Sequence, residues 1–411
     1  MTKKVILAYS GGLDTSAAIR WIKEKYNMEV ITLTINVGDD RDSSAVQQKA
    51  LKVGALKALV IDAKETFVND FIFPALQANA IYQGRYSLAT ALARPLIAKL
   101  LVEVAEKEKA SAVAHGCTGK GNDQVRFDVS VAALAPHLEI IAPAREWGMT
   151  REETIAYAKK YNIPIPITSA SPYSIDENLW GRSIECGILE DPWAEPPEEV
   201  FKWTSSPEDT PNKPCYIEIG FEKGIPITLD KRQMDGITLI QELNGIAGKH
   251  GVGRIDHVED RLVGIKSREI YEAPAATALL TAHQALEALT LSKGQLKLKD
   301  MIANEYAELI YNGLWFTALR QDISAFMQSS QRYVSGIVRL KLFKGNCQVV
   351  GRKSPYALYR HELATYDKGD LFDQSASPGF IHIWGLSART QAQVQPNKPS
   401  DIIASEEKET E

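Results

Sequence analysis

A serine, two glycines, an aspartate and two further hydroxyl residues stand together near the start of the chain, in AYSGGLDTS (residues 8–16). The apolar run VIL (5–7) comes directly before them. Glycine lets the main chain approach a ligand closely and adopt positive φ, and the unpaired N–H groups of a helix N-terminus attract anions. Ser10, Thr15 and Ser16 add hydroxyl donors. The pattern therefore predicts a phosphate-binding turn between a strand and a helix.

Two familiar phosphate loops do not fit this turn. A Walker A loop needs a lysine after its glycines, where this chain has Asp14, and the G-x-G-x-x-G dinucleotide fingerprint is missing. A loop without that lysine suits a pyrophosphate that leaves when the bond between the α- and β-phosphates breaks. Residues 10–16 resemble the SGG-L-D-[ST]-S signature of the PP-loop ATP pyrophosphatases. Asp14 either helps to position Mg²⁺ on the phosphates or caps the helix that it begins.

A second polar cluster, HGCTGKGNDQVRF (115–127), follows a short predicted strand. Ligands of parallel sheets bind at the carboxyl ends of the strands, and the glycines here allow close backbone approach. A carboxylate can hold an ammonium group while a guanidinium grips a carboxylate. The cluster therefore favours an amino-acid site, with a solvated polar loop as the alternative. Two further polar segments, 171–185 and 248–274, contain no H-x-x-H or H-E-x-x-H pattern for a metal.

The elements that must position these residues alternate along the first 165 residues. We expect strands at 5–9, 30–37, 58–62, 111–114 and 138–142, and helices at 15–25, 43–53 and 90–109. Thr150 and Glu153 have the spacing of a capping box, which begins a helix that runs to about residue 161. Alternating strands and helices indicate an α/β fold with a mostly parallel sheet covered on both faces.

The pattern changes at Pro164 and Pro166, where a proline-rich stretch predicts a domain boundary followed by irregular structure. Beyond it we expect hairpins at 215–229 and 334–350, and helices at 238–247, 275–289 and 298–311, which make an α+β part. The predicted domains are 1–165, 166–365 and 366–411; the family resemblance given below implies ATP binding for the first, synthetase and multimerisation roles for the second, and a C-terminal arm with a polar tail for the third. A helix over 354–365 is expected to begin the arm, and 391–411 to be a solvated tail.

Composition limits the classes of function. The 411 residues are 45% hydrophobic and 24% charged, with a formal net charge of -5, which argues against a general nucleic-acid binder. No run approaches the roughly 20 apolar residues of a membrane span. Four cysteines without a C-x-x-C pair indicate free thiols. We expect a cytoplasmic protein, or a plastid-like location if a transit peptide was removed.

Four motifs together resemble the argininosuccinate synthase family: AYSGGLDTS, GCTGKGNDQVRF, SIDENLWGRSIE, and GKHGVGRIDHVEDR with GIKSREIYE. The resemblance implies an AMP-forming ligase of arginine biosynthesis. It would condense L-citrulline and L-aspartate with ATP, through a citrullyl-adenylate, to give argininosuccinate, AMP and pyrophosphate. It also implies a PP-loop (adenine nucleotide alpha hydrolase-like) domain, a synthetase domain and a homotetramer with a C-terminal oligomerisation arm. Mg²⁺ would accompany ATP; no tightly bound cofactor, protein metal site, nucleic acid or membrane partner is expected.

The same resemblance implies the site residues, without a general base. ATP would be bound by Ala8, Tyr9, Ser10, Gly11, Gly12, Leu13, Asp14, Thr15, Ser16, Ile35 and Gly116. Aspartate would be held by Thr118, Asn122 and Asp123. Citrulline would be held by Tyr86, Asn122, Arg126, Ser174, Ser183, Glu259 and Tyr271. One departure is Ala91, where the family usually has a serine that helps to bind citrulline; Thr90 or a water would then supply the missing donor.

Two other classes of function are the alternatives to this ligase. A thiouridine-forming or GMP-forming PP-loop enzyme should show cysteine pairs, a basic surface or a glutaminase cysteine, and none is evident in the sequence. A catalytically silent nucleotide-binding protein would keep the loop and lose the substrate contacts, but Asn122, Asp123, Arg126 and Glu259 are all present. Citrulline-dependent release of pyrophosphate would distinguish these alternatives.

Overall fold

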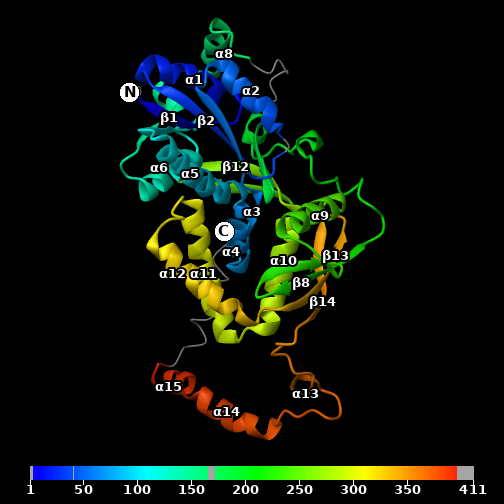
Figure 1. The fold of residues 1–411 in the computed structure, drawn as a ribbon. Coiled ribbons are helices and arrows are strands. Elements are labelled where there is room, and N and C mark those ends of the chain that lie inside the picture. The colour runs from blue at the N-terminus through cyan, green and yellow to red at the C-terminus, as the bar shows by residue number, and fades with distance from the viewer. Residues whose placement is uncertain (1–2, 40, 165–171, 396–411) are drawn as a thin grey trace, which may run out of the picture. The chain divides into compact units, whose positions relative to one another are not determined.

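The computed structural model describes residues 3–39, 41–164 and 172–395 (Figure 1). The chain divides into two compact units between Leu358 and Tyr359. The domain boundaries expected near 165 and 365 stay a prediction.

The N-terminal sheet contains five parallel strands in the order β3-β2-β1-β4-β5. Their bounds are β1 Lys4–Ala8, β2 Glu29–Asn36, β3 Lys57–Asp62, β4 Ala112–Ala114 and β5 Glu139–Ile141. Successive side chains of a strand point to opposite faces, so Ile6 enters one core while Val5 and Leu7 enter another. Both faces are therefore covered, which confirms the expected α/β fold and explains the apolar runs of these strands.

Helices lie on the two faces of this sheet, as expected, although the helix Asn122–Leu134 was not predicted. The main ones are α1 Leu13–Tyr26, α2 Ser43–Val53, α5 Ala89–Glu108, α6 Asn122–Leu134 and α8 Arg151–Lys160. Thr150 and Glu153 form the predicted capping box of α8. Sequence reasoning missed a helical stretch made of α3 Lys64–Thr66, a π-helix Phe67–Ile72 and α4 Phe73–Gln77, and the short helix α7 Pro143–Glu146.

A second sheet, antiparallel, has the order β10-β9-β8-β13-β14. Its strands are β8 Cys215–Glu222, β9 Ile225–Leu229, β10 Arg232–Gln233, β13 Gly336–Phe343 and β14 Asn346–Lys353, so both predicted hairpins are confirmed. The helices of this part are α9 Gly236–Lys249, α10 Pro274–Thr290, α11 Lys293–Tyr311 and α12 Ala318–Ser330. Figure 1 shows α9 and α10 beside this sheet, with α11 and α12 forming a separate pair.

A third sheet, with the order β11-β12-β7-β6, was not expected. Its strands are β6 Ser174–Asn178, β7 Gly181–Glu185, β11 Arg254–Asp260 and β12 Lys266–Glu272. The first two lie where irregular structure was predicted, so that prediction is wrong there. Three short 3₁₀ turns complete this part, at Gly187–Glu190, Glu198–Val200 and Gln331–Tyr333.

The C-terminal unit contains α13 His361–Ala364, a 3₁₀ turn Gln374–Ala376, α14 Ser377–Trp384 and α15 Leu386–Val394. The helix expected over 354–365 is wrong apart from α13. Ser354 Oγ donates to the carbonyl of Ser335 and accepts from the amide of Tyr356, which fixes a turn instead. At the start of the expected solvated tail, residues 391–394 belong to α15 and are exposed; residues 396–411 lie outside the described part.

Candidate active site

The glycine turn after β1 has the predicted strand–turn–helix form. Gly11 has φ +77°, a conformation that glycine adopts without strain, and Gly12 stands at the N-cap of α1. Ser10 Oγ accepts from the Gly12 amide at 3.3 Å and lies 3.1 Å from Thr15 Oγ1. Ser16 is buried and its hydroxyl lies 3.0 Å from Tyr9 Oη. The turn is therefore braced by its own hydroxyl groups.

A cavity of about 220 Å³ opens at the carboxyl ends of β1, β2 and β4. The neighbours of β1 are β2 on one side and β4 on the other, and such a switch point is where parallel sheets bind ligands. A Cβ on Gly116 would lie 2.8 Å from Thr15 Cγ2, so the loop after β4 closes directly on α1. The expected ATP residues that line this cavity are Ala8, Tyr9, Ser10, Thr15, Ile35 and Gly116.

The remaining expected ATP residues do not line the cavity themselves. Gly11, Gly12, Leu13, Asp14 and Ser16 belong to the same turn or to the first turn of α1. Burial raises the pKa of Asp14, which Arg151 partly opposes.

Two cations that sequence reasoning missed reach the phosphate turn from outside it. Lys49 on α2 donates to the Gly11 carbonyl at 2.6 Å, and Arg41 donates to the Ser10 carbonyl at 3.2 Å. Burial lowers the pKa of Lys49. These residues lie 38 and 31 positions from their partners, so no local pattern identifies them.

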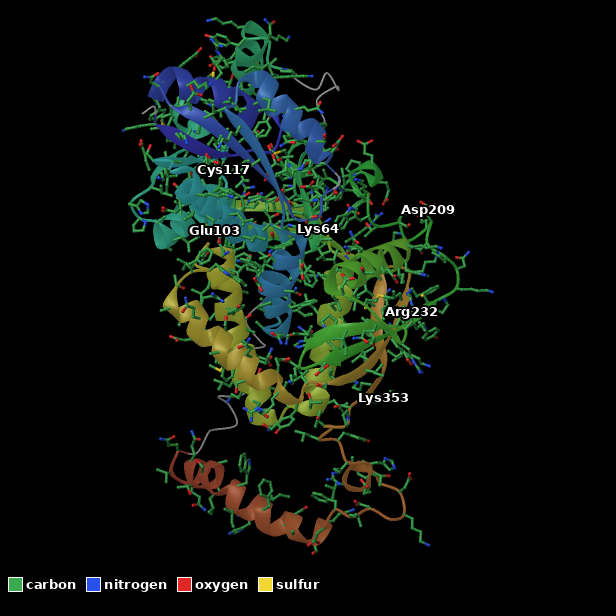
Figure 2. All side chains as sticks on the ribbon, in the orientation of Figure 1. Lys64, Glu103, Cys117, Asp209, Arg232 and Lys353 are labelled. Carbon is green, nitrogen blue, oxygen red and sulfur yellow. The ribbon has the colours of Figure 1, made fainter. Side chains whose placement is uncertain are left out.

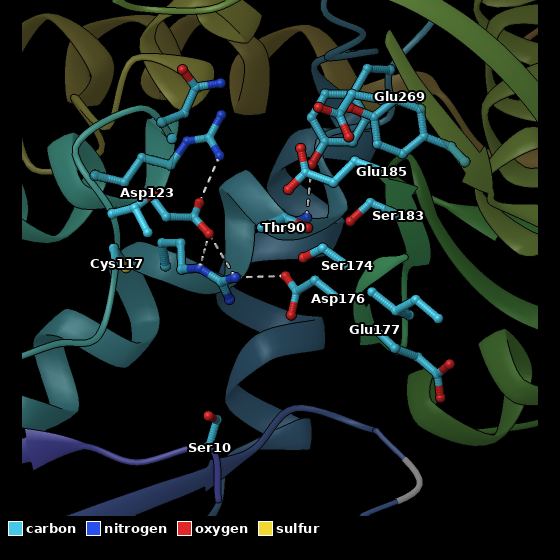
Figure 3. Close-up of a pocket in the computed structure, with 18 of the residues that line it drawn as sticks. Ser10, Thr90, Cys117, Asp123, Ser174, Asp176, Glu177, Ser183, Glu185 and Glu269 are labelled. Atoms are coloured by element: carbon cyan, nitrogen blue, oxygen red, sulfur yellow. Dashed lines mark hydrogen bonds and ion pairs between the residues drawn. The ribbon is translucent and has the colours of Figure 1, made fainter. Parts of the chain in front are cut away.

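A larger cleft of about 680 Å³ adjoins this cavity. Every residue expected to bind aspartate or citrulline lines it: Tyr86, Thr118, Asn122, Asp123, Arg126, Ser174, Ser183, Glu259 and Tyr271. Residues shared by the two cavities are Ser10, Arg41, Arg94, Gly116, Cys117 and Asp176. Figure 3 shows Asp123 and Asp176 on opposite sides of the cleft, with Ser10 of the phosphate turn below both.

Asp123 lies between two guanidinium groups. Arg94 Nε donates to its Oδ2 and Arg126 Nη1 to its Oδ1, each at 2.9 Å. Burial alone would raise the pKa of Asp123, but the two arginines outweigh burial and hold the pKa below its ordinary value. Asp123 is therefore a carboxylate at neutral pH.

Arg126 is almost fully buried, yet part of its hydrogen-bonding capacity is unused. Its Nε donates to the Tyr311 carbonyl at 2.9 Å. Its Nη2 is buried and has no hydrogen-bond partner. A buried donor without a partner is costly, and a carboxylate in the cleft would satisfy it.

Glu259 lies at the centre of a buried hydroxyl network. Tyr271 and Tyr311 each donate to one of its carboxylate oxygens at 2.6 Å. Asn122 Nδ2 donates in turn to Tyr311 Oη at 2.7 Å. Sequence reasoning missed Tyr311, which stands at the end of the predicted helix 298–311. The network places amide and carboxylate groups from three distant segments on one wall of the cleft.

The structure also shows the surroundings of Ala91, the position at which this chain departs from the family pattern. Ala91 is completely buried, whereas Thr90 lines the cleft. The backbone amide of Thr90 donates to Tyr86 Oη at 2.9 Å, and the rings of Tyr86 and Tyr271 stack 4.3 Å apart. Thr90 therefore lies at the wall of the cleft, whereas Ala91 does not.

A further charged group in the cleft was not anticipated. One nitrogen of Arg261 contacts both Glu185 and Glu269, the latter at 2.8 Å. Burial and the neighbouring Glu185 raise the pKa of Glu269, although Arg261 opposes them. The four cysteines are free thiols, as expected.

Known protein families match the N-terminal and C-terminal parts of the chain separately. A family model described as the arginosuccinate synthase N-terminal HUP domain matches residues 4–164, and one for the C-terminal domain matches 173–391. An argininosuccinate synthase of Dehalococcoides mccartyi is 63% identical over 396 residues, which cover 96% of this chain and 98% of that protein. Those of Gloeobacter violaceus (59%) and Symbiobacterium thermophilum (58%) each cover 96% of this chain and 99% of the relative. Within the described residues, no helix is long and apolar enough to cross a membrane.

Proposed function

Because this chain belongs to the argininosuccinate synthase family, we propose that its two adjoining cavities carry out the two halves of the family reaction. The family condenses citrulline and aspartate with ATP to give argininosuccinate, in arginine biosynthesis. In the first half, the ureido oxygen of citrulline attacks the α-phosphate and pyrophosphate leaves. In the second, the amine of aspartate attacks the adenylated carbon and expels AMP. Adenylation turns a poor leaving group into a good one.

The observation that carries this proposal is the convergence in the cleft. Residues expected to bind citrulline and aspartate come from the segment before α5, the loop between β4 and α6, α6 itself and the third sheet, and all of them line one cleft beside the phosphate turn. Holding the reactants in one cavity removes much of the entropic barrier. The arrangement supports direct transfer of the adenylyl group from one cavity to the other.

The smaller cavity is proposed to hold ATP, with the phosphates on the turn of Gly11 and Gly12. The amides at the start of α1 and the hydroxyls of Ser10 and Thr15 supply donors for the departing pyrophosphate. Leu33, Ile35 and Ile97 give this cavity an apolar side that suits the adenine ring.

Mg²⁺ is proposed to enter with ATP. This ion usually binds one or two protein carboxylates together with substrate phosphates. The described residues contain no group of three or more His, Cys, Asp or Glu side chains that could hold a metal alone. Asp14, in the first turn of α1 next to the phosphate turn, is the carboxylate proposed to share the ion with the phosphates. The ion would supply charge neutralisation for the departing pyrophosphate.

In the larger cleft, Arg126 is proposed to bind the carboxylate of citrulline through its unused Nη2. Glu259 would accept hydrogen bonds from the other end of citrulline, because each of its oxygens receives only one hydrogen bond from the residues that the structure describes. Asp123 would bind the ammonium group of aspartate, with Thr118 and Asn122 as further contacts. Tyr86, Ser174, Ser183 and Tyr271 complete the proposed citrulline site.

We further propose a cytoplasmic homotetramer, in which the C-terminal unit contacts another copy of the chain. In α14, Phe380, Ile381, Ile383 and Trp384 expose between 61% and 79% of their surface. A helix that is apolar on all sides is normally buried against something. A second copy is the partner that the family resemblance implies.

The function is tested by supplying ATP, Mg²⁺ and citrulline without aspartate, and measuring the exchange of labelled pyrophosphate into ATP. Exchange that depends on citrulline is expected, because adenylation is reversible while pyrophosphate is present. Addition of aspartate should then give argininosuccinate and AMP in equal amounts. Exchange that does not need citrulline would contradict the proposal and favour another PP-loop activity.

A further inference from the structure

Arg94 lies where the two cavities meet, although the sequence assigned it no role. It stands on α5 and lines both the nucleotide cavity and the amino-acid cleft. Only about 15% of its side chain is exposed. During adenylation the α-phosphate must lie at this junction, because it leaves the nucleotide and joins citrulline. A cation fixed at this junction would lie next to the reacting α-phosphorus.

The hydrogen bonds of Arg94 leave one of its nitrogens available. Its Nε donates to Asp123 at 2.9 Å, and its Nη2 lies 2.8 Å from Asp123 and 2.6 Å from Asp176. Nη1 donates to no side chain or carbonyl among the residues that the structure describes, and it is absent from the buried atoms that lack a partner. With respect to the described residues, Nη1 is therefore open to the cavities that Arg94 lines. A guanidinium has five donors in a fixed fork, so three of them hold Arg94 while two remain for a ligand.

The two carboxylates come from opposite sides of the cleft, which makes the fork rigid. Asp123 lies in the first turn of α6, and Asp176 lies on β6 of the third sheet. Donors that are fixed before the reaction stabilise developing charge without reorganisation. The other arginine shared by both cavities, Arg41, is 42% exposed and is already used by Asp39 and Ser10. Arg94 is thus the better fixed of the two.

We propose, on the basis of the function proposed above, that Arg94 is a catalytic residue of adenylation. Its Nη1 donates hydrogen bonds to a non-bridging oxygen of the α-phosphate, while Nε and Nη2 stay on Asp123 and Asp176. The ureido oxygen forms a bond to the α-phosphorus, and the bond to the bridging oxygen breaks. Pyrophosphate leaves with the electron pair of that bond. Arg94 keeps its proton throughout and neutralises charge on the phosphorane-like transition state.

A purely structural role predicts a different result. If Arg94 only orients Asp123, its loss should weaken aspartate binding and leave adenylation unchanged. Exchange of labelled pyrophosphate into ATP, measured with citrulline and without aspartate, reports adenylation alone. The assay therefore separates the two roles in the full-length protein.

The test compares wild type with Arg94→Gln and Arg94→Lys. Removal of one donor to a developing oxyanion typically costs about 10²–10³ in rate, so Arg94→Gln should lower the exchange rate by roughly that factor. Arg94→Lys keeps the charge but lacks the guanidinium fork. Its exchange rate should therefore lie between the rates of wild type and Arg94→Gln. Arg232→Gln is the matched control: Arg232 lies exposed on β10 of the second sheet, pairs with Glu242 of α9 and is apart from Cys117 in the cleft (Figure 2). It should exchange at the wild-type rate.

Each outcome has a defined meaning. Absence of citrulline-dependent exchange in wild type contradicts the proposed function, not the role of Arg94 within it. Wild-type exchange in Arg94→Lys or Arg94→Gln, with a raised KM for aspartate in the complete reaction, overturns the inference. If thermal unfolding shows that neither variant folds, Asp176→Asn decides, since its side chain is about one third exposed. It should lower exchange several-fold, and an unchanged rate would also overturn the inference.

Discussion

At the scale of single residues, the unused donor of Arg126 gives the sharpest expectation. A hydrogen bond to a charged group is worth about 1.5–3 kcal/mol, so Arg126→Gln should raise the KM for citrulline by roughly 10- to 150-fold. The KM for ATP should change little, because Arg126 does not line the nucleotide cavity. Steady-state kinetics with each substrate varied in turn measures both values. Arg339→Gln, which removes an exposed pair with Glu218, should leave both values unchanged; a normal citrulline KM in Arg126→Gln would refute the assignment.

Glu269 predicts a pH dependence of stability. Its pKa is raised in the folded protein, mainly by burial and then by Glu185. The folded state therefore holds a proton that the unfolded chain releases above a pKa of about 4.3. Stability is fully present below that value and is lost as pH rises towards the folded pKa. Glu269→Gln, which cannot ionise, should be as stable as wild type in acid and more stable at pH 8–9.

Denaturant unfolding at a series of pH values measures this difference. Glu242→Gln serves as the control, because Glu242 pairs with Arg232 at the surface and should leave the pH profile parallel to that of wild type. A constant difference between Glu269→Gln and wild type across the range would show that Glu269 ionises normally.

At the scale of the elements, helix α2 contacts the phosphate turn through one of its lysines. Lys49 donates to the Gly11 carbonyl from this helix at 2.6 Å. Lys49→Met should loosen the turn and raise the KM for ATP several-fold, with a smaller effect on citrulline. Lys52→Met is a matched control on the same helix, since Lys52 is exposed and has no contact with the turn. An ATP KM equal to that of the control would show that the turn holds its shape without Lys49.

The first sheet could be predicted from the sequence because its central strands β1, β2 and β4 are buried on both faces. Such strands read as short apolar runs, and the intervening helices carry their own caps, as Thr150 and Glu153 illustrate. The third sheet could not be predicted in this way. Ser174, Asp176, Ser183 and Glu185 alternate along β6 and β7 and all line the cleft. A strand whose polar face serves a binding site loses the apolar signal that marks strands elsewhere.

The same distinction applies to the site. Residues inside compact motifs, such as Asn122 and Asp123 at the start of α6, were predictable from local sequence and family resemblance. Lys49, Arg261 and Tyr311 were not, because each reaches the site only after distant elements pack together. Their roles depend on tertiary distances that no spacing in the sequence records.

At the scale of the whole molecule, the exposed apolar residues of the C-terminal unit bear on assembly. Tyr366 is fully exposed and Trp384 is 79% exposed. Burial of a large apolar side chain contributes about 1.5–3 kcal/mol, so a surface with several such side chains gains substantially from a partner. Association through this unit should also depend on protein concentration.

Trp384→Asp tests that association in the full-length chain. A charge within an apolar contact is strongly unfavourable unless it is paired, so the variant should shift from the proposed tetramer to smaller species in sedimentation velocity. Thr390→Asp introduces the same charge on exposed α15 and should sediment as wild type does. The cleft lies entirely within residues 1–358, so citrulline-dependent pyrophosphate exchange should survive in Trp384→Asp. A variant that remained tetrameric would place the contact between copies on another surface, and one that lost exchange would link assembly to catalysis.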